Sequence, residues 1–186
     1  MRIRAKLLLA SVLPLTMFIA PLPAAAGDEK PYAGFEKRAI KALSEQQIAD
    51  LRAGRGMTLA LAAELNGYPG PVHVLEHAQA LKLTPQQEDR TKSLFGAMKS
   101  EAIPLGTRLI EQEAMLDDMF AAKKITSADL VKATEAIALT QARLRQAHLK
   151  YHLSMMEVLS QEQILRYREL RGYTSQDGLS QPHKHN

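Results

Sequence analysis

Two long stretches of the sequence repeat apolar residues at the spacing of an amphipathic helix. Between residues 85 and 123, apolar side chains recur every three, four or seven positions from Leu94 to Met119. Between residues 127 and 158, the same spacing runs from Leu130 to Met155. Because only a few residues separate the two stretches, the helices are expected to lie antiparallel, each burying its apolar stripe on the other.

Pro104 lies inside the first of these helices, with Gly106 close by. Proline lacks the N–H of an interior helical residue, and its ring clashes with the preceding turn. We therefore expect this helix to continue through Pro104 but to bend near its middle.

A short motif, L-[S/T]-x-x-Q, occurs at residues 43–47, 83–87 and 159–163. In each, the Ser or Thr hydroxyl is expected to cap the helix that follows, and the Gln amide to reach back to the backbone N–H of the capping residue. The defining Leu, Ser/Thr and Gln positions are Leu83, Thr84 and Gln87 in the second motif and Leu159, Ser160 and Gln163 in the third.

Shorter helices are expected on both sides of the hairpin. Apolar spacing favours helical turns at 35–43, after Ser44, at 57–65 and at 71–82, and a last helix ending at Arg171-Gly172. Two glycines and two prolines between Asn66 and Pro71 interrupt the chain. Tryptophan is absent and aromatic residues are few. The predicted fold class is all-α, a long antiparallel helical hairpin with short flanking helices.

The N-terminus has the pattern of an export signal. Basic residues at positions 2, 4 and 6 precede an apolar run to Ile19, and Ala24-Ala25-Ala26 is a small-residue cleavage site. We expect cleavage near Ala26 and an exported protein. The chain has no cysteine, so its stability must come from packing and not from disulfides.

The charge and organisation follow from this assignment. The chain has 24 basic and 20 acidic residues. Three of the basic residues lie in 1–26, so the chain after the predicted cleavage site has 21 basic and 20 acidic residues. This balance gives no case for nucleic-acid binding, which needs a clustered basic face. The expected organisation is a signal peptide (1–26), an N-terminal extension with short helices (27–70), a helical hairpin domain (71–172) and a disordered tail (173–186).

Histidines recur four residues apart ahead of two of the motifs. His73 and His77 precede residues 83–87, whereas His148, His152 and Met156 precede residues 159–163. Residues four apart share one helix face, and imidazole with a thioether favours Cu, Ni, Co or Zn over Mg or Ca. The sequence therefore suggests a metal site formed by His73, His77, His148, His152 and Met156.

Simpler interpretations stay open for these residues. His148 falls on the apolar stripe of Leu144 and fits a packed, hydrogen-bonded core position, and Met156 fits a gap-filling one. His73 and His77 fit a surface position. With Glu76 they also match H-x-x-E-H, the motif of inverted zinc proteases, but such an enzyme needs a third ligand and a substrate cleft. We expect a protein that is not an enzyme.

The exported, cysteine-free, helical chain with its L-[S/T]-x-x-Q motifs resembles the Spy/CpxP family of bacterial periplasmic proteins over about residues 71–172. The superfamily includes the heavy-metal sensor CnrX and the zinc-responsive ZraP. The resemblance implies a homodimer of curved hairpins that binds misfolded proteins, restrains a membrane-bound sensor protein, or senses metal. His73-x-x-x-His77 and His152-x-x-x-Met156 match the ligand pattern of CnrX-like sensors, although the glutamate those sensors supply has no counterpart near Phe95.

Two functions follow from the resemblance as expectations. The first is a non-enzymatic envelope-stress protein that binds unfolded clients and possesses a transition-metal site as an additional feature. The alternative is a dedicated heavy-metal sensor or metal-buffering protein of the CnrX/ZraP type.

Overall fold

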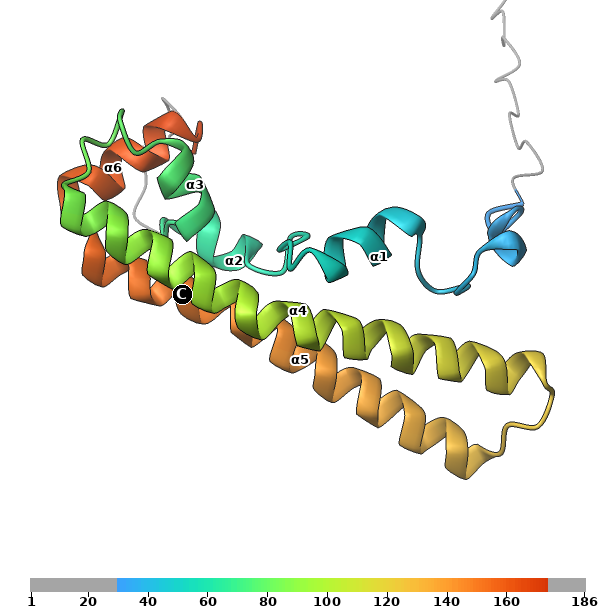
Figure 1. Cartoon of the computed structure of the whole chain (residues 1–186). Helices are drawn as coiled ribbons and strands as arrows, with labels where there is room; N and C mark the ends of the chain where they lie inside the picture. The colour runs from blue at the N-terminus through green and yellow to red at the C-terminus, as the bar shows by residue number, and fades with distance from the viewer. Residues whose placement is uncertain (1–29, 174–186) are drawn as a thin grey trace, which may run out of the picture. The chain divides into compact units, whose positions relative to one another are not determined.

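The computed structural model describes residues 30–173, and this part of the chain is helical with no strand (Figure 1). The predicted signal peptide and residues 174–186 lie outside the described residues. The chain divides into two units after Ala33. Of the first unit, residues 30–33 form a turn. The elements of the second unit, in chain order, are a 3₁₀ turn Phe35–Lys37, α1 Glu45–Arg52, α2 Leu61–Glu64, α3 Pro71–Glu76, α4 Pro85–Ala121, α5 Ser127–Val158 and α6 Gln161–Leu170.

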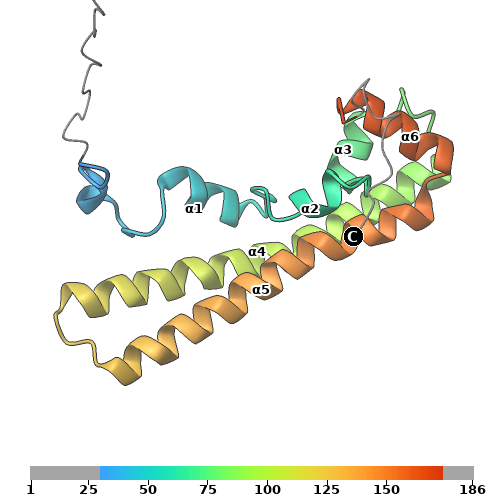
Figure 2. The same ribbon diagram turned by 180° about the vertical axis from the view of Figure 1, so that it is seen from behind.

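The predicted helical pair is confirmed. Helices α4 and α5 contain 37 and 32 residues and pack along each other (Figures 1 and 2). Their bounds differ from the predicted ranges by at most two residues. Thr126 begins α5 with a capping box closed by Asp129, so the turn between the helices ends on a defined cap.

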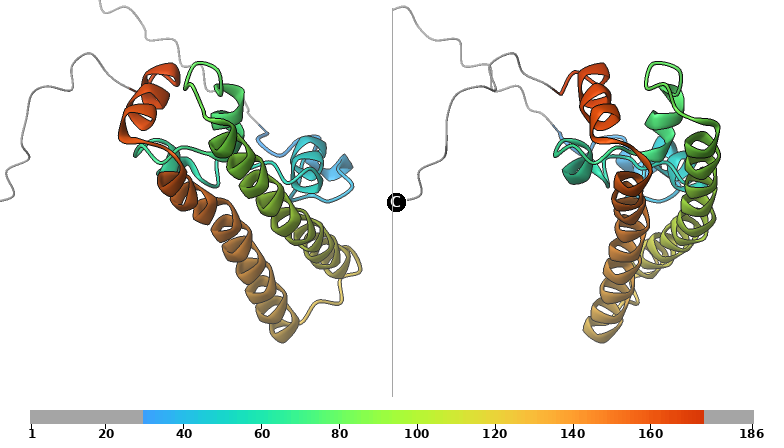
Figure 3. Two further views of the ribbon diagram at one scale, coloured as in Figure 1. Left: turned by 60° about the vertical axis from the view of Figure 1, so that its left-hand side comes forward. Right: turned by 90° about the vertical axis from the view of Figure 1, so that its left-hand side faces the viewer.

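Pro104 lies inside α4 without ending it. Figure 3 shows α4 changing direction along its length, as the missing N–H and the ring clash of proline predict.

Two apolar clusters form the core. One lies where α3 and α6 meet the hairpin and contains Val74, Leu81, Leu94, Met98, Tyr151, Met155, Leu159, Ile164 and Tyr167. The other lies further along the hairpin and contains Ile40, Leu51, Ala102, Leu109, Ile110, Ile137 and Leu144. Because Ile40 and Leu51 belong to the second cluster, the part of the N-terminal extension that contains them packs on the hairpin and shares its core.

The short helices are shorter than the apolar spacing predicted. Only Phe35–Lys37 of the range 35–43 is helical, and only Leu61–Glu64 of the range 57–65. Helix α3 ends at Glu76 and not near Lys82, which has a left-handed φ of 49°. The chain must turn there to bury Leu81 and still start α4 at the Thr84 cap, and this tertiary requirement overrides the local spacing.

The C-terminal boundary is also shifted. The sequence predicts that Tyr173 belongs to a disordered tail, but its hydroxyl donates to Glu64 Oε1 at 3.1 Å. The packed part of the chain therefore extends at least to Tyr173. Within residues 30–173, no helix has the length and apolar character that crossing a membrane requires.

Candidate functional site

All three L-[S/T]-x-x-Q motifs form the predicted capping boxes. Ser44, Thr84 and Ser160 each accept from the backbone N–H three residues on, and the Gln side chain of each motif accepts from the N–H of its capping residue. The helix starts predicted from these motifs are therefore confirmed.

Two of the three boxes are joined to each other. Gln87 Nε2 donates to Gln163 Oε1 at 2.8 Å, and Gln163 Nε2 donates to Gln87 Oε1 at 3.0 Å. The remaining amide hydrogens go to the carbonyl oxygens of Val158 at 2.9 Å and Leu81 at 3.2 Å. This amide pair fixes the starts of α4 and α6 to each other, to the end of α5 and to the turn after α3. In the remaining motif, at 43–47, the side chains of Ser44 and Gln47 form only their own box.

A cavity of about 590 Å³ lies beside this end of the hairpin. Its walls come from the α1–α2 connection, α2, α3, α4, α5 and the residues that follow α6. Three of the predicted ligands, His73, His148 and His152, line it, but His77 and Met156 do not.

His152 is buried and held in one orientation. Its Nδ1 lies 2.7 Å from the carbonyl oxygen of Tyr68. Because a carbonyl only accepts, Nδ1 carries the hydrogen and the neutral ring keeps its lone pair on Nε2. The ring packs against Gly70, where an added Cβ would lie 2.9 Å from Cε1.

His148 is 3% exposed, and its Nε2 has no hydrogen-bond partner in the described residues. Burial, with a smaller contribution from the charge of His152, lowers the pKa of His148 below its ordinary 6.5. His148 is therefore buried on the stripe of Leu144, as the alternative predicted, but its Nε2 lacks the hydrogen bond that this alternative expected.

The other predicted ligands lie elsewhere. His77 is the C-cap of α3, and Met156 packs, partly buried, against the first apolar cluster. His73 is partly exposed, with its Nδ1 2.9 Å from Glu76 Oε2. Across residues 30–173, no three His, Cys, Asp or Glu side chains lie close enough together to hold a metal ion. The residues present do not form a ready-made metal site of the predicted composition.

A buried carboxylate beside the cavity was missed by the sequence analysis. Glu64, at the end of α2, is 6% exposed. Its Oε1 accepts from Tyr167 at 2.5 Å, from Arg171 Nε at 3.1 Å and from Tyr173. Burial and the hydrogen bond to Glu64 raise the pKa of Tyr167 well above its usual range. These contacts tie α2 to α6, about a hundred residues apart in the sequence.

The second carboxylate oxygen of this residue has no such partners. Glu64 Oε2 is buried without a hydrogen-bond donor in the described residues, and His152 Nδ1 is 3.8 Å away. A Glu in an Ala- and Leu-rich segment carries no sequence signal for this position, since its partners come from the opposite end of the chain.

No known protein family, no curated protein and no solved structure matches this chain.

Proposed function

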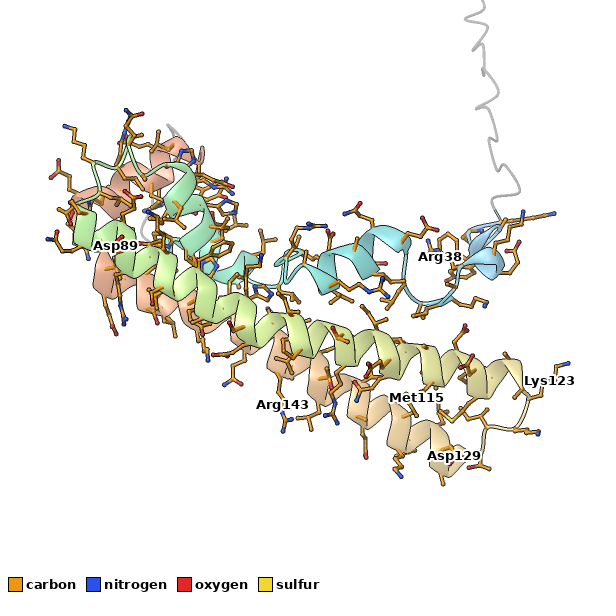
Figure 4. All side chains as sticks on the ribbon, in the orientation of Figure 1. Arg38, Asp89, Met115, Lys123, Asp129 and Arg143 are labelled. Carbon is orange, nitrogen blue, oxygen red and sulfur yellow. The ribbon has the colours of Figure 1, made fainter. Side chains whose placement is uncertain are left out.

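We propose that this chain is an exported, non-enzymatic helical protein of the Spy/CpxP type that binds unfolded client proteins. The observation that supports this proposal is the exposure of large apolar side chains on the part of the hairpin nearest the α4–α5 loop. We name these residues the distal apolar surface: Met115, Phe120, Leu130, Val131 and Leu139, each between 39% and 64% exposed. Figure 4 places Met115 in this part of the hairpin, near Lys123 and Asp129 and far from Asp89.

Exposed apolar groups of this kind mark contact sites for other proteins. Charged residues such as Lys123, Lys124 and Asp129 lie close to them in the sequence, and we expect these charges to keep the region hydrated when no client is bound. An unfolded chain offers matching apolar segments, and burying them stabilises the complex by about 25 cal/mol per Å². The same surface suits the homodimer that the family resemblance implies.

The test is suppression of aggregation of a chemically denatured client, followed by light scattering in buffer containing a chelator. We expect the wild type to suppress aggregation and the double variant Phe120→Gln/Leu139→Gln to lose most of this effect. The matched control is Leu165→Gln, which changes an apolar residue of α6 that is 55% exposed and should leave suppression unchanged. No suppression by excess wild type would refute the proposal.

A second candidate function is metal sensing or buffering. The observation that favours it is the presence of His73, His148 and His152 in the walls of one cavity. The bond from His152 Nδ1 to the Tyr68 carbonyl is also the support typical of a ligating histidine, because it orients the ring and leaves Nε2 free. For this second function, the family resemblance implies a membrane-bound sensor protein as the partner.

Calorimetry with Cu, Ni, Co and Zn separates this candidate from the first. We expect His152→Ala to weaken metal binding and His77→Ala, outside the cavity, to leave it unchanged. Equal and weak binding by the wild type and both variants would remove metal sensing as a function.

A further inference from the structure

The N-terminal extension is tied to the rest of the fold by a set of polar contacts at one end. Glu64 Oε1 accepts from Tyr167 in α6 and from Arg171 Nε just after it. The carbonyl oxygen of Tyr68 lies 2.7 Å from His152 Nδ1 in α5. These contacts anchor the part of the extension that runs from the end of α2 to α3.

The part of the extension before α2 is held differently. We name residues 38–53, which include α1, the strap. Among the described residues, the one hydrogen bond or ion pair between the strap and the hairpin joins Lys41 Nζ to Asp117 Oδ2 at 3.2 Å, and the Lys41 side chain is 49% exposed. Because an exposed ion pair contributes little to stability, the strap is held mainly by apolar packing.

The strap covers one face of α4. Figures 1 and 2 show α1 alongside α4. The backbone of Leu51 lies against Gly106, and a Cβ built on Gly54, just after the strap, would lie 3.0 Å from Ile103 Cγ1. Residues three or four apart share a helix face, so the contacts define one apolar stripe of α4. We name this stripe the covered surface: Ala102, Ile103, Gly106 and Ile110.

A strained junction joins the strap to the anchored part of the extension. Met57 and Thr58 have left-handed φ values of 39° and 70°, and Gly54 has a φ of 64°. The left-handed region is unfavourable for residues with a Cβ, most of all for β-branched Thr. Such strain persists only while the surrounding packing maintains it, so release of the strap also relieves the strain in the junction.

Helix α1 depends on its contact with the hairpin. It has eight residues, and a helix of this length is not stable in water by itself. A strap that leaves α4 therefore loses its helix, and the side chains of Ile40 and Leu51, buried in the second cluster, become accessible together with the covered surface.

We propose that the strap is an autoinhibitory segment, which opens about residues 54–58 and uncovers a second client-binding surface on α4. The inference rests on the proposed client-binding function. In the closed form, Ile40 and Leu51 of the strap pack in the cluster that includes Ala102 and Ile110. An unfolded client offers apolar side chains of the same kind and takes their place. Because only the open form binds clients at this surface, the apparent affinity is reduced by the fraction of molecules that are open.

One test displaces the strap. Gly106→Ala introduces a Cβ against the backbone of Leu51, whereas Gly96→Ala, the matched control, meets nothing within 4 Å. Both are made in the Phe120→Gln/Leu139→Gln background, which lacks the distal apolar surface. Overpacking of one core contact should raise the open fraction at least about fivefold. We therefore expect Gly106→Ala to reach half-maximal suppression of client aggregation at about fivefold lower concentration than Gly96→Ala. Equal suppression by the two variants would overturn the proposal.

A second test locks the strap without changing its packing against Gly106. The chain has no cysteine, so Lys41→Cys/Asp117→Cys in the same background has two unique thiols, which a short bismaleimide can bridge. The control is the same protein with each thiol capped by N-ethylmaleimide. We expect the bridged protein to suppress aggregation less and the amides of α1 to exchange hydrogen more slowly. Slower exchange with equal suppression would show that the closed strap does not block clients, which would contradict the proposal.

The outcomes separate this inference from the proposed function. Suppression by the wild type, with no gain from Gly106→Ala in the variant background, leaves the distal apolar surface as the client site and rejects the strap. An inactive wild type, with a gain from Gly106→Ala, rejects the distal apolar surface and supports the strap. If Gly106→Ala loses its helical circular dichroism, the comparison of bridged and capped protein decides.

Discussion

Gly106 permits a close backbone contact between α1 and α4. It is a buried residue of α4, and a Cβ built on it would lie 2.4 Å from the carbonyl oxygen and 2.9 Å from the carbonyl carbon of Leu51. Both are backbone atoms, so no side-chain rotation relieves the clash. Gly106→Ala must therefore push the end of α1 away from α4.

The size of the effect follows from two opposing contributions. Replacing glycine by alanine inside a helix stabilises it by ~0.5–1 kcal/mol, whereas overpacking a core contact costs ~1–3 kcal/mol. Gly96, also in α4, is the matched control, since its added Cβ would meet nothing within 4 Å. Gly96→Ala should gain only the helix contribution, so the two variants should differ in free energy of unfolding by about 1–3 kcal/mol.

The measurement is urea unfolding of the wild type and both variants, followed by circular dichroism. Detachment of α1 would also expose Leu51, 3% exposed in the fold, and this sets the upper end of the range at about 3 kcal/mol for one apolar side chain. If Gly106→Ala proves as stable as Gly96→Ala, the docking of α1 against α4 described above is wrong.

Three further changes test the polar contacts. Gln87→Glu should destabilise the fold by ~1–3 kcal/mol because it removes a donor from the amide pair, whereas Gln47→Glu, in the unpaired box, should stay within about 0.5 kcal/mol of the wild type in the same assay. Burial lowers the pKa of His148 in the folded state, so as the pH falls the unfolded state takes up a proton on His148 before the folded state does. The contribution of neutral His148 to the free energy of unfolding is therefore full above pH 6.5 and is lost as the pH falls below that value. Thermal melts at pH 7.5 and 5 should therefore show a smaller acid loss in His148→Phe than in the wild type. Tyr167→Phe removes the shortest bond to Glu64 and should lower the free energy of unfolding by ~1–3 kcal/mol; a neutral result would mean that the tie between α2 and α6 contributes no stability.

The hairpin and its caps could be predicted because their signals are local. A stripe of apolar residues and a box of Thr84 and Gln87 each involve residues within a few turns of one another. The pairing of Gln87 with Gln163 could not be predicted, because the capping box of each motif already accounts for the presence of its Gln. Nothing in the motif at 43–47 distinguishes it from the two that pair.

The predicted metal site shows the limit of spacing arguments most clearly. Spacing by four correctly placed His148 and His152 on one face of α5, and both line the cavity. It also placed His77 with His73, but α3 ends at Glu76, and only His73 reaches the cavity wall. Glu64, whose Oε2 lies 3.8 Å from His152 Nδ1, comes from the extension, whose packing depends on tertiary contacts.

A metal bound at His152 Nε2 would compete with the packing of the extension at Gly70. An added Cβ on Gly70 would lie 3.2 Å from His152 Nε2, the nitrogen that a metal would need. If His152 takes up a metal on the side that faces Gly70, we expect the backbone at Gly70 to shift, and with it the nearby Glu64 Oε2, 3.5 Å from the same Cβ position. By thermodynamic linkage, any variant that loosens Glu64 from α6 should then strengthen metal binding. Tyr167→Phe thus separates the two functions: tighter metal binding in this variant supports sensing, and unchanged binding leaves the client-binding function as the one the fold favours.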